Sequence, residues 1–110
     1  MNDELRKRID DMVRAKRVVL FMKGSSMMPM CGFSASALTT LRAAGAKEIA
    51  TFDVLKDPEL RAGIKEYSSW PTVPQIYIDG KFVGGSDILK EMHDRGELAA
   101  LLAPAASATP

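Results

Sequence analysis

The chain has 110 residues, of which 46% are hydrophobic and 26% are charged, as is typical of a single soluble globular domain. Its 15 Lys and Arg and 14 Asp and Glu give a formal net charge of +1, so neither nucleic acid nor a membrane surface is expected as a partner. The single cysteine, Cys31, cannot form an intramolecular disulfide, which argues against a disulfide-framed secreted fold and for a reducing compartment.

The N-terminal segment predicts an amphipathic helix over residues 3–15. Asn2 or Asp3 can cap it, because short polar side chains accept hydrogen bonds from the free N–H groups of a first helical turn. Apolar side chains recur at helical spacing behind that cap. They are Leu5, Ile9, Met12 and Val13. One face of the helix is therefore expected to pack on a sheet.

An unbroken apolar run at residues 18–22 predicts a central strand that is covered on both faces. The chain then leads through Lys23 to Cys31, and a second helix is expected over residues 32–44. Its apolar positions are Phe33, Ala37, Leu38 and Leu41. Gly45 follows, and a glycine in that place can close a helix in the left-handed conformation.

A second strand is expected at residues 49–54, and a third helix follows it. Asp57 suits the N-cap of this helix and Pro58 its first position, because proline has no N–H group to leave unpaired there. The helix is expected to run to about Tyr67. This strand and helix repeat the βα arrangement predicted around the cysteine.

The clearest turn signal is an Asp-Gly dipeptide between two short apolar runs, which predicts a hairpin of residues 75–78 and 81–83. A last helical pattern follows the hairpin. Ser86 or Asp87 is expected to cap it, and a glycine interrupts it before residues 97–102.

The order α-β-α-β-α-β-β-α predicts an α/β fold with a mixed four-stranded sheet and helices on both faces. The domain is expected to span residues 1–102, and residues 103–110 form a small-residue tail that is expected to be disordered. The first 17 residues mix acidic with basic side chains and hold no long apolar stretch, unlike transit or signal peptides. The expected location is the cytoplasm.

Cys31 is placed for chemistry at the start of a predicted helix, where free N–H groups and the helix dipole favour a thiolate. The alternative is a buried, unreactive cysteine. In a C-x-x-C motif a second thiol resolves the mixed disulfide that the first one forms, but Ser34 occupies that position here. Cys31 therefore needs an external thiol to complete a redox cycle, or else catalysis is not its main role.

Three separated motifs resemble the monothiol glutaredoxins of the CGFS type, with the resemblance running from about residue 5 to residue 102. The motifs are Lys23-Gly24 with Pro29 and Cys31-Gly32-Phe33-Ser34, then Trp70-Pro71-Thr72-Val73-Pro74-Gln75, and then Gly84-Gly85-Ser86-Asp87. The resemblance implies a thioredoxin/glutaredoxin fold, with a glutaredoxin domain over residues 1–102. It also implies a cis peptide bond before Pro74, which would leave the Val73 backbone free to pair with a bound peptide.

The resemblance further implies that the ligand is glutathione. A Gly-Gly-Ser-Asp turn at a helix start can present N–H groups to an anion, although a plain capped turn is equally possible from the residues alone. In the resembled family this turn holds the γ-glutamyl carboxylate, with Lys23 and Arg61 near the glycine carboxylate. The implied glutathione contacts are Lys23, Phe33, Arg61, Val73, Pro74, Gly85, Ser86 and Asp87.

The same resemblance implies a [2Fe–2S] cluster that bridges a homodimer, with Cys31 as its metal ligand. Such a cluster usually takes four ligands, and this chain has one thiolate to give. Two chains and two glutathiones complete the set. The implied role is storage and transfer of the cluster to iron–sulfur apoproteins, with a BolA-like protein as a further partner.

Two alternatives use the same thiol. The first is a glutathione-dependent oxidoreductase, in which Cys31 takes glutathione from a mixed disulfide and a second glutathione resolves it. The second is a Cu(I) site, because soft thioethers surround the thiol. These are Met22, Met27, Met28 and Met30. Methionine also fills apolar gaps in protein cores, which is the more favoured explanation for them.

Overall fold

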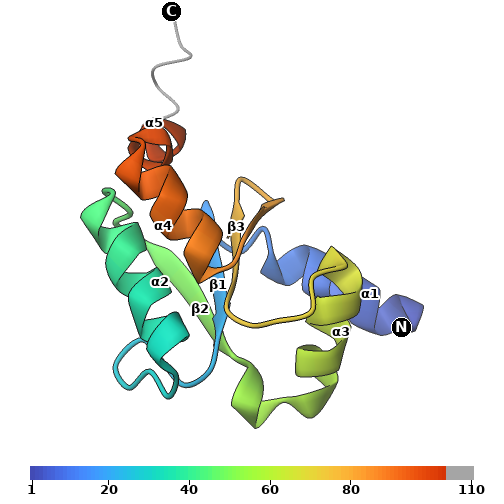
Figure 1. The fold of residues 1–110 in the computed structure, drawn as a ribbon. Coiled ribbons are helices and arrows are strands. Elements are labelled where there is room, and N and C mark those ends of the chain that lie inside the picture. The colour runs from blue at the N-terminus through green and yellow to red at the C-terminus, as the bar shows by residue number, and fades with distance from the viewer. Residues whose placement is uncertain (104–110) are drawn as a thin grey trace, which may run out of the picture.

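The computed structural model describes residues 1–103, so the tail predicted to be disordered lies, from residue 104 onward, outside the described residues. Figure 1 shows a central sheet with helices on both sides. The elements in chain order are α1 (Asp3–Met12), β1 (Val18–Met22), α2 (Gly32–Ala43), β2 (Ile49–Asp53), the 3₁₀ helix η1 (Val54–Lys56), α3 (Pro58–Ser68), β3 (Gln75–Ile78), β4 (Lys81–Gly84), α4 (Ser86–Asp94) and α5 (Glu97–Leu102).

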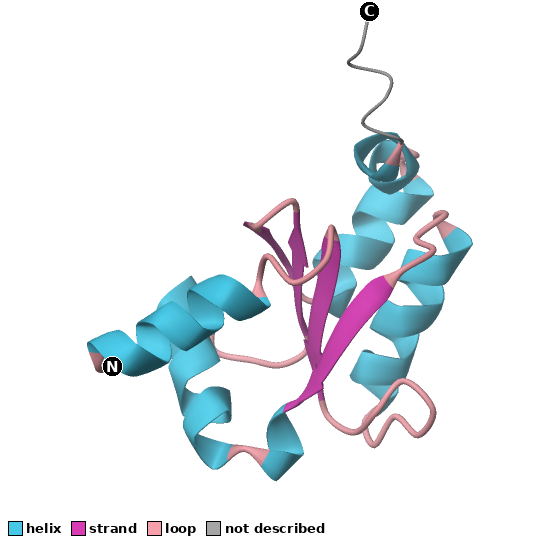
Figure 2. Ribbon diagram, turned by 180° about the vertical axis from the view of Figure 1, so that it is seen from behind, coloured by secondary structure: helices cyan, strands magenta, loops and turns pink. Residues whose placement is uncertain are grey.

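The four strands form one mixed sheet in the order β2-β1-β3-β4. β1 pairs in parallel with β2 and antiparallel with β3, and β3 continues into β4 as an antiparallel hairpin. α1 and α3 lie on one side of the sheet, whereas α2 and α4 lie on the other (Figure 1 and Figure 2). The predicted α/β fold, with a mixed sheet between two layers of helices, is confirmed.

Each face of the sheet has its own apolar core, because successive side chains of a strand point to opposite faces. From β1, Val19 and Phe21 enter the core that includes residues of α1 and α3. Leu20 and Met22 enter the core that includes residues of α2, α4 and α5. All residues of β1 are buried, as predicted for a central strand. The buried strand β1 therefore fixes the start of the loop that leads to Cys31.

Several predicted boundaries are confirmed by local geometry. Asp57 is the N-cap of α3, and its Oδ1 accepts a hydrogen bond from the Leu60 N–H at 3.1 Å. Asp79 and Gly80 join β3 to β4 with φ angles of +53° and +77°, as a type I′ turn requires. Gly45 follows α2 with φ +106°. Within the described residues, no helix has the length and apolar character needed to cross a membrane.

Other boundaries differ from the prediction. α1 ends at Met12 rather than residue 15, because the next N–H groups, those of Arg14 and Ala15, donate to carbonyls three residues back and tighten the chain into turns. β2 ends at Asp53, whose carboxylate accepts from the Leu55 N–H at 2.9 Å and opens η1, which the sequence pattern did not predict.

The start of α4 also differs, since neither Ser86 nor Asp87 is its cap. The N-cap is Gly85 in an extended conformation, and Ser86 is the first residue of the helix. Because Gly85 has no side chain to accept a hydrogen bond, the first N–H groups of α4 have no side-chain cap. This leaves the helix N-terminus open toward the neighbouring loops.

Candidate functional site

Cys31 is the N-cap of α2, with extended backbone angles and without a side-chain cap hydrogen bond. The backbone N–H of Ser34 lowers the pKa of the Cys31 thiol, and this effect outweighs the slight burial that would raise it. The N–H of Phe33, the Ser34 hydroxyl and the charge of Lys23 lower the pKa further. The predicted preference for thiolate is therefore supported, and the alternative of a buried, inert cysteine is wrong because Cys31 is only partly buried.

Two side-chain acceptors hold the start of the loop that leads to Cys31. The Ser34 side chain is fully buried, and its Oγ accepts a hydrogen bond from the Lys23 N–H at 3.1 Å. Asp53 Oδ1 accepts from the Gly24 N–H at 3.0 Å. Ser34 therefore has a positioning role at this loop in addition to its effect on the thiol.

The second part of the site is the loop before β3, where the peptide bond between Val73 and Pro74 is cis as predicted. Val73 is buried, yet within residues 1–103 its backbone N–H and C=O make no hydrogen bond to the protein. An unpaired backbone at a pocket wall can pair with an extended peptide. The expectation for Val73 therefore agrees with its geometry.

The third part is the open N-terminus of α4. Gly85 has no Cβ, and a Cβ there would lie 3.4 Å from the Trp70 indole nitrogen and 3.4 Å from the Pro74 carbonyl oxygen. A Cβ at this position would thus be in ordinary van der Waals contact, which shows that the turn lies directly against the second loop. Ser86 and Asp87 follow at the positive end of the helix, where free N–H groups favour an anion.

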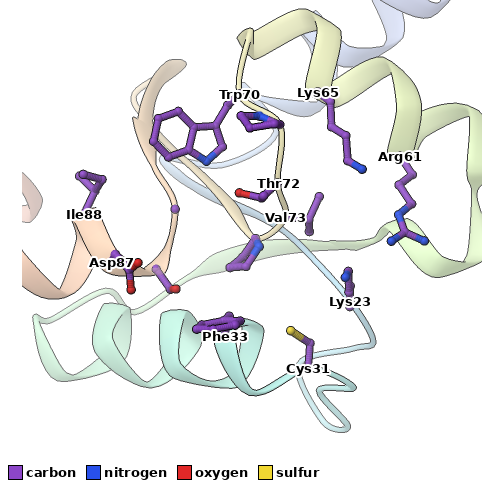
Figure 3. Close-up of a pocket in the computed structure, with 14 residues that line it drawn as sticks. Lys23, Cys31, Phe33, Arg61, Lys65, Trp70, Thr72, Val73, Asp87 and Ile88 are labelled. Carbon is purple, nitrogen blue, oxygen red and sulfur yellow. The ribbon is translucent and has the colours of Figure 1, made fainter.

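These three parts enclose a pocket of about 430 Å³, a size suited to a small ligand. Figure 3 shows Cys31 and Phe33 along its base, with Lys23, Arg61 and Lys65 gathered on one side and Asp87 on the other. All nine residues predicted for the site line this pocket. They are Lys23, Cys31, Phe33, Arg61, Val73, Pro74, Gly85, Ser86 and Asp87. Their roles as ligand contacts stay predictions.

Five lining residues are absent from the predicted set. They are Lys65, Trp70, Pro71, Thr72 and Ile88. Lys65 lies one helical turn after Arg61 on α3, so the helical period alone could have found it. Trp70 to Thr72 belong to the motif that carries the resemblance. Ile88 lies in the first turn of α4, which begins at Ser86.

Two apolar residues lie elsewhere than expected. Phe33 lines the pocket as expected, but 63% of it is exposed, so it contributes less to the core than its apolar position in the predicted helix of residues 32–44 suggests. It lies in the first turn of α2, where no other element covers it. Met22 is fully buried in the core on β1 and cannot join a copper site. The copper hypothesis therefore reduces to Cys31 with the exposed Met27, Met28 and Met30.

A mixed sheet of this topology, with one activated thiol at a helix N-terminus and a cis-proline on the same pocket, defines a single-thiol protein of the thioredoxin fold. The family model for glutaredoxins matches residues 18–83. The chain belongs to the glutaredoxin family, and its similarity to monothiol glutaredoxins together with its lone cysteine places it among the monothiol members.

The similarity extends over nearly the whole chain. An uncharacterized monothiol glutaredoxin of Synechocystis, described as ycf64-like, is 52% identical over 102 residues, which cover 93% of this chain and 94% of that protein. The mitochondrial monothiol glutaredoxin-5 of Schizosaccharomyces pombe is 47% identical over 104 residues, covering 93% and 71%. Among solved structures, reduced poplar apo GrxS14 superposes with a TM-score of 0.77 at 46% identity and covers 87% of each chain.

Proposed function

We propose that this protein binds glutathione in the pocket beside Cys31 and that two copies share a [2Fe–2S] cluster, which they store and transfer to iron–sulfur apoproteins. A BolA-like protein is the proposed regulatory partner, and the cytoplasm is the proposed location. The proposal depends mainly on one observation. The single activated thiol opens on a pocket that has cationic side chains at one end and a free helix N-terminus at the other.

Glutathione is a tripeptide with a carboxylate at each end and a thiol between them, and the pocket offers a feature for each part. Lys23 and Arg61 are placed for one carboxylate, and the N-terminus of α4 is placed for the other. The unpaired backbone of Val73 can exchange hydrogen bonds with the peptide backbone between them. The donor set therefore fits this ligand.

The chain's own residues fit one ligand position of a cluster. Within residues 1–103, no three His, Cys, Asp or Glu side chains come together to hold a metal ion. Cys31 is the one thiolate that each chain can give, so two chains supply two of the four ligands. Two glutathione thiolates would supply the others. When bound, the cluster would provide iron and sulfide in a form that thiolates of an acceptor can take over.

The test is anaerobic reconstitution with iron, sulfide and glutathione, followed by visible absorption, iron and sulfide content, and native mass. We expect a coloured dimer that is lost when glutathione is omitted or when Cys31→Ser is used. A colourless monomer, or a Cys31→Ser variant that retains a full cluster, would overturn the proposal.

The lowered pKa of Cys31 also favours a second function, that of a glutathione-dependent oxidoreductase. The Cys31 thiolate attacks the glutathione sulfur of a protein–glutathione disulfide, and the protein thiolate leaves and takes up a proton. A second glutathione thiolate then attacks the sulfur bound to Cys31, which forms oxidised glutathione and regenerates the Cys31 thiolate. Turnover of a glutathionylated protein by the colourless monomer would favour this function over the carrier.

A further inference from the structure

We propose that Gln75, which does not line the pocket, is the positioning residue for the loop of residues 70–74 and so for glutathione. That glutathione is the ligand rests on the proposed function, whereas the contacts of Gln75 are observed in the structure. The Gln75 side chain is fully buried at the start of β3. Burying an amide costs free energy unless its polar atoms form hydrogen bonds, and here both the nitrogen and the oxygen of the amide have partners.

The amide holds the loop from beneath by its two donors. Gln75 Nε2 donates to the carbonyl oxygen of Trp70 at 3.1 Å and to that of Thr72 at 3.2 Å. These carbonyls lie on both sides of Pro71 and directly before Val73, whose backbone faces the pocket. This side chain therefore holds the segment between α3 and β3 at two carbonyls, while the Trp70 N–H at its start donates to Ser68 Oγ at 3.1 Å and to the Lys65 carbonyl at 3.2 Å.

The amide is in turn fixed by Tyr77, which lies on the same face of β3. The Tyr77 hydroxyl donates to Gln75 Oε1 at 3.3 Å, which determines which end of the amide faces the loop. Burial raises the pKa of Tyr77, so its hydroxyl stays a donor over the working pH range of the protein. Phe21, Tyr67 and Phe82 pack around the Tyr77 ring and hold it in place.

Through Trp70, the loop of residues 70–74 also contacts the other side of the pocket. The Trp70 ring packs against Phe82 at a centroid distance of 5.6 Å, and its nitrogen faces Gly85 at the open end of α4. That nitrogen is buried and has no hydrogen-bond partner among the described residues. Only packing and the bonds of the Trp70 backbone therefore locate the indole. A shift of the Trp70 carbonyl would move the indole away from Gly85 and change the distance between the two halves of the pocket.

The chain is well suited to a direct test because it contains one Gln, one Trp and one Asn. The ¹⁵N spectrum of the protein therefore has a side-chain amide signal from Gln75, one from the exposed Asn2 and one indole signal from Trp70. In the ligand-free wild type we expect the Gln75 amide protons to exchange with solvent far more slowly than those of Asn2. Equal exchange would overturn the proposal without any substitution.

Gln75→Met keeps the length of the side chain and removes both donors. We expect a shifted Trp70 indole signal and fluorescence, and glutathione binding that is about tenfold weaker by calorimetry, since two hydrogen bonds are lost. Tyr77→Phe keeps both donors, so its effect on binding is expected to be smaller. Leu98→Ala is the matched control. Leu98 lies on α5 and is buried in the core on the other face of the sheet, so this variant should lower stability without changing the indole signal or the affinity.

Gln75→Met with an unchanged indole signal and wild-type glutathione affinity would overturn the positioning role. A loss of affinity in Leu98→Ala equal to that in Gln75→Met would also overturn it, because stability alone would then explain both. If the wild type binds no glutathione, the proposed function fails. The exchange and indole signals still decide whether Gln75 positions the loop.

Discussion

The loop before Cys31 (residues 24–30) and the loop before Gln75 (residues 70–74) are adjacent to the same pocket, but they are held in different ways. Apart from the Ser34 and Asp53 acceptors at its start, the first is held by its own backbone. Ser25 and Met28 exchange two backbone hydrogen bonds, each of 3.1 Å, and the Met30 N–H donates to the Lys23 carbonyl at 2.9 Å. The second is held at two carbonyls by the buried amide of Gln75, and its Trp70 N–H is also bonded to the end of α3.

The side chains of the two loops differ in the same sense. Met27 and Met28 are 92% and 71% exposed. In the second loop Pro71 and Thr72 are exposed as well, but Val73 and Pro74, next to Gln75, are buried. We therefore expect the first loop to tolerate changes of its own side chains but to depend on its backbone path, and the second loop to depend most on the buried Gln75 side chain outside it. The thiol is thus presented on a loop whose surface can vary without altering the pocket wall.

Among the substitutions that test this difference between the loops, the largest effect is expected at Gly24, where the surrounding backbone leaves no room for a side chain. Gly24 has φ +90°, and a Cβ there would lie 2.5 Å from the Met28 carbonyl oxygen and 2.6 Å from the Met30 nitrogen. Gly24→Ala should therefore lower the free energy of unfolding by about 2–4 kcal/mol, measured by urea denaturation.

Gly32→Ala is the matched control on the other side of Cys31. A Cβ at Gly32 meets nothing within 4 Å, and its φ is not in the left-handed region. Since alanine favours the first turn of α2, this variant should be neutral or more stable by up to about 1 kcal/mol. Equal destabilisation by both substitutions would show that the loop is not limited by its backbone path.

The next effect is expected at Ser34, the one buried side chain that holds the first loop from within α2. Ser34→Ala leaves the Lys23 N–H without its acceptor and should cost about 1–2 kcal/mol of unfolding free energy. It should also raise the pKa of Cys31, because the hydroxyl contributes to lowering it. Ser36→Ala, at an exposed position of the same helix, should change neither quantity appreciably.

The parts of the fold that could be predicted from sequence are those fixed by neighbouring residues. The limits of β1 follow from an apolar run, the turn at Asp79-Gly80 from two residue types that adopt positive φ readily, and the start of α3 from the side chain of Asp57. In each case the cause lies within a few positions of its effect. The predicted site residues line one pocket because the predicted fold, which the structure confirms, brings their three motifs together.

The parts that could not be predicted depend on contacts between distant segments. Gly85 rather than Ser86 is the N-cap of α4, and its turn packs against Trp70 and Pro74, a contact that the helical pattern does not show. Phe33 fits the apolar spacing of α2, yet no other element covers that turn. Gln75 is polar and lies in a buried strand, and its role is visible only when the fold brings two carbonyls above it.

A further prediction concerns the reactivity of the Cys31 thiol, which follows the first loop, rather than the stability of the protein. Because the Ser34 N–H and its neighbours lower the pKa of Cys31, more of the thiol is ionised at a given pH than in an unfolded chain. Alkylation by iodoacetamide should therefore reach half its maximal rate at a lower pH in the native protein than in urea-unfolded protein. Coincident pH profiles would show that the helix N-terminus does not activate this thiol.

The smallest effect is expected for the exposed side chains of the first loop. Met27, Met28 and Met30 are mostly exposed, and the loop is held by backbone hydrogen bonds that serine in their place would keep. The triple substitution to serine should therefore change the free energy of unfolding by less than about 1 kcal/mol in urea denaturation. A larger loss would mean that these thioethers pack against the loop and help to hold it. The first loop would then depend on side chains, as the second does on Gln75.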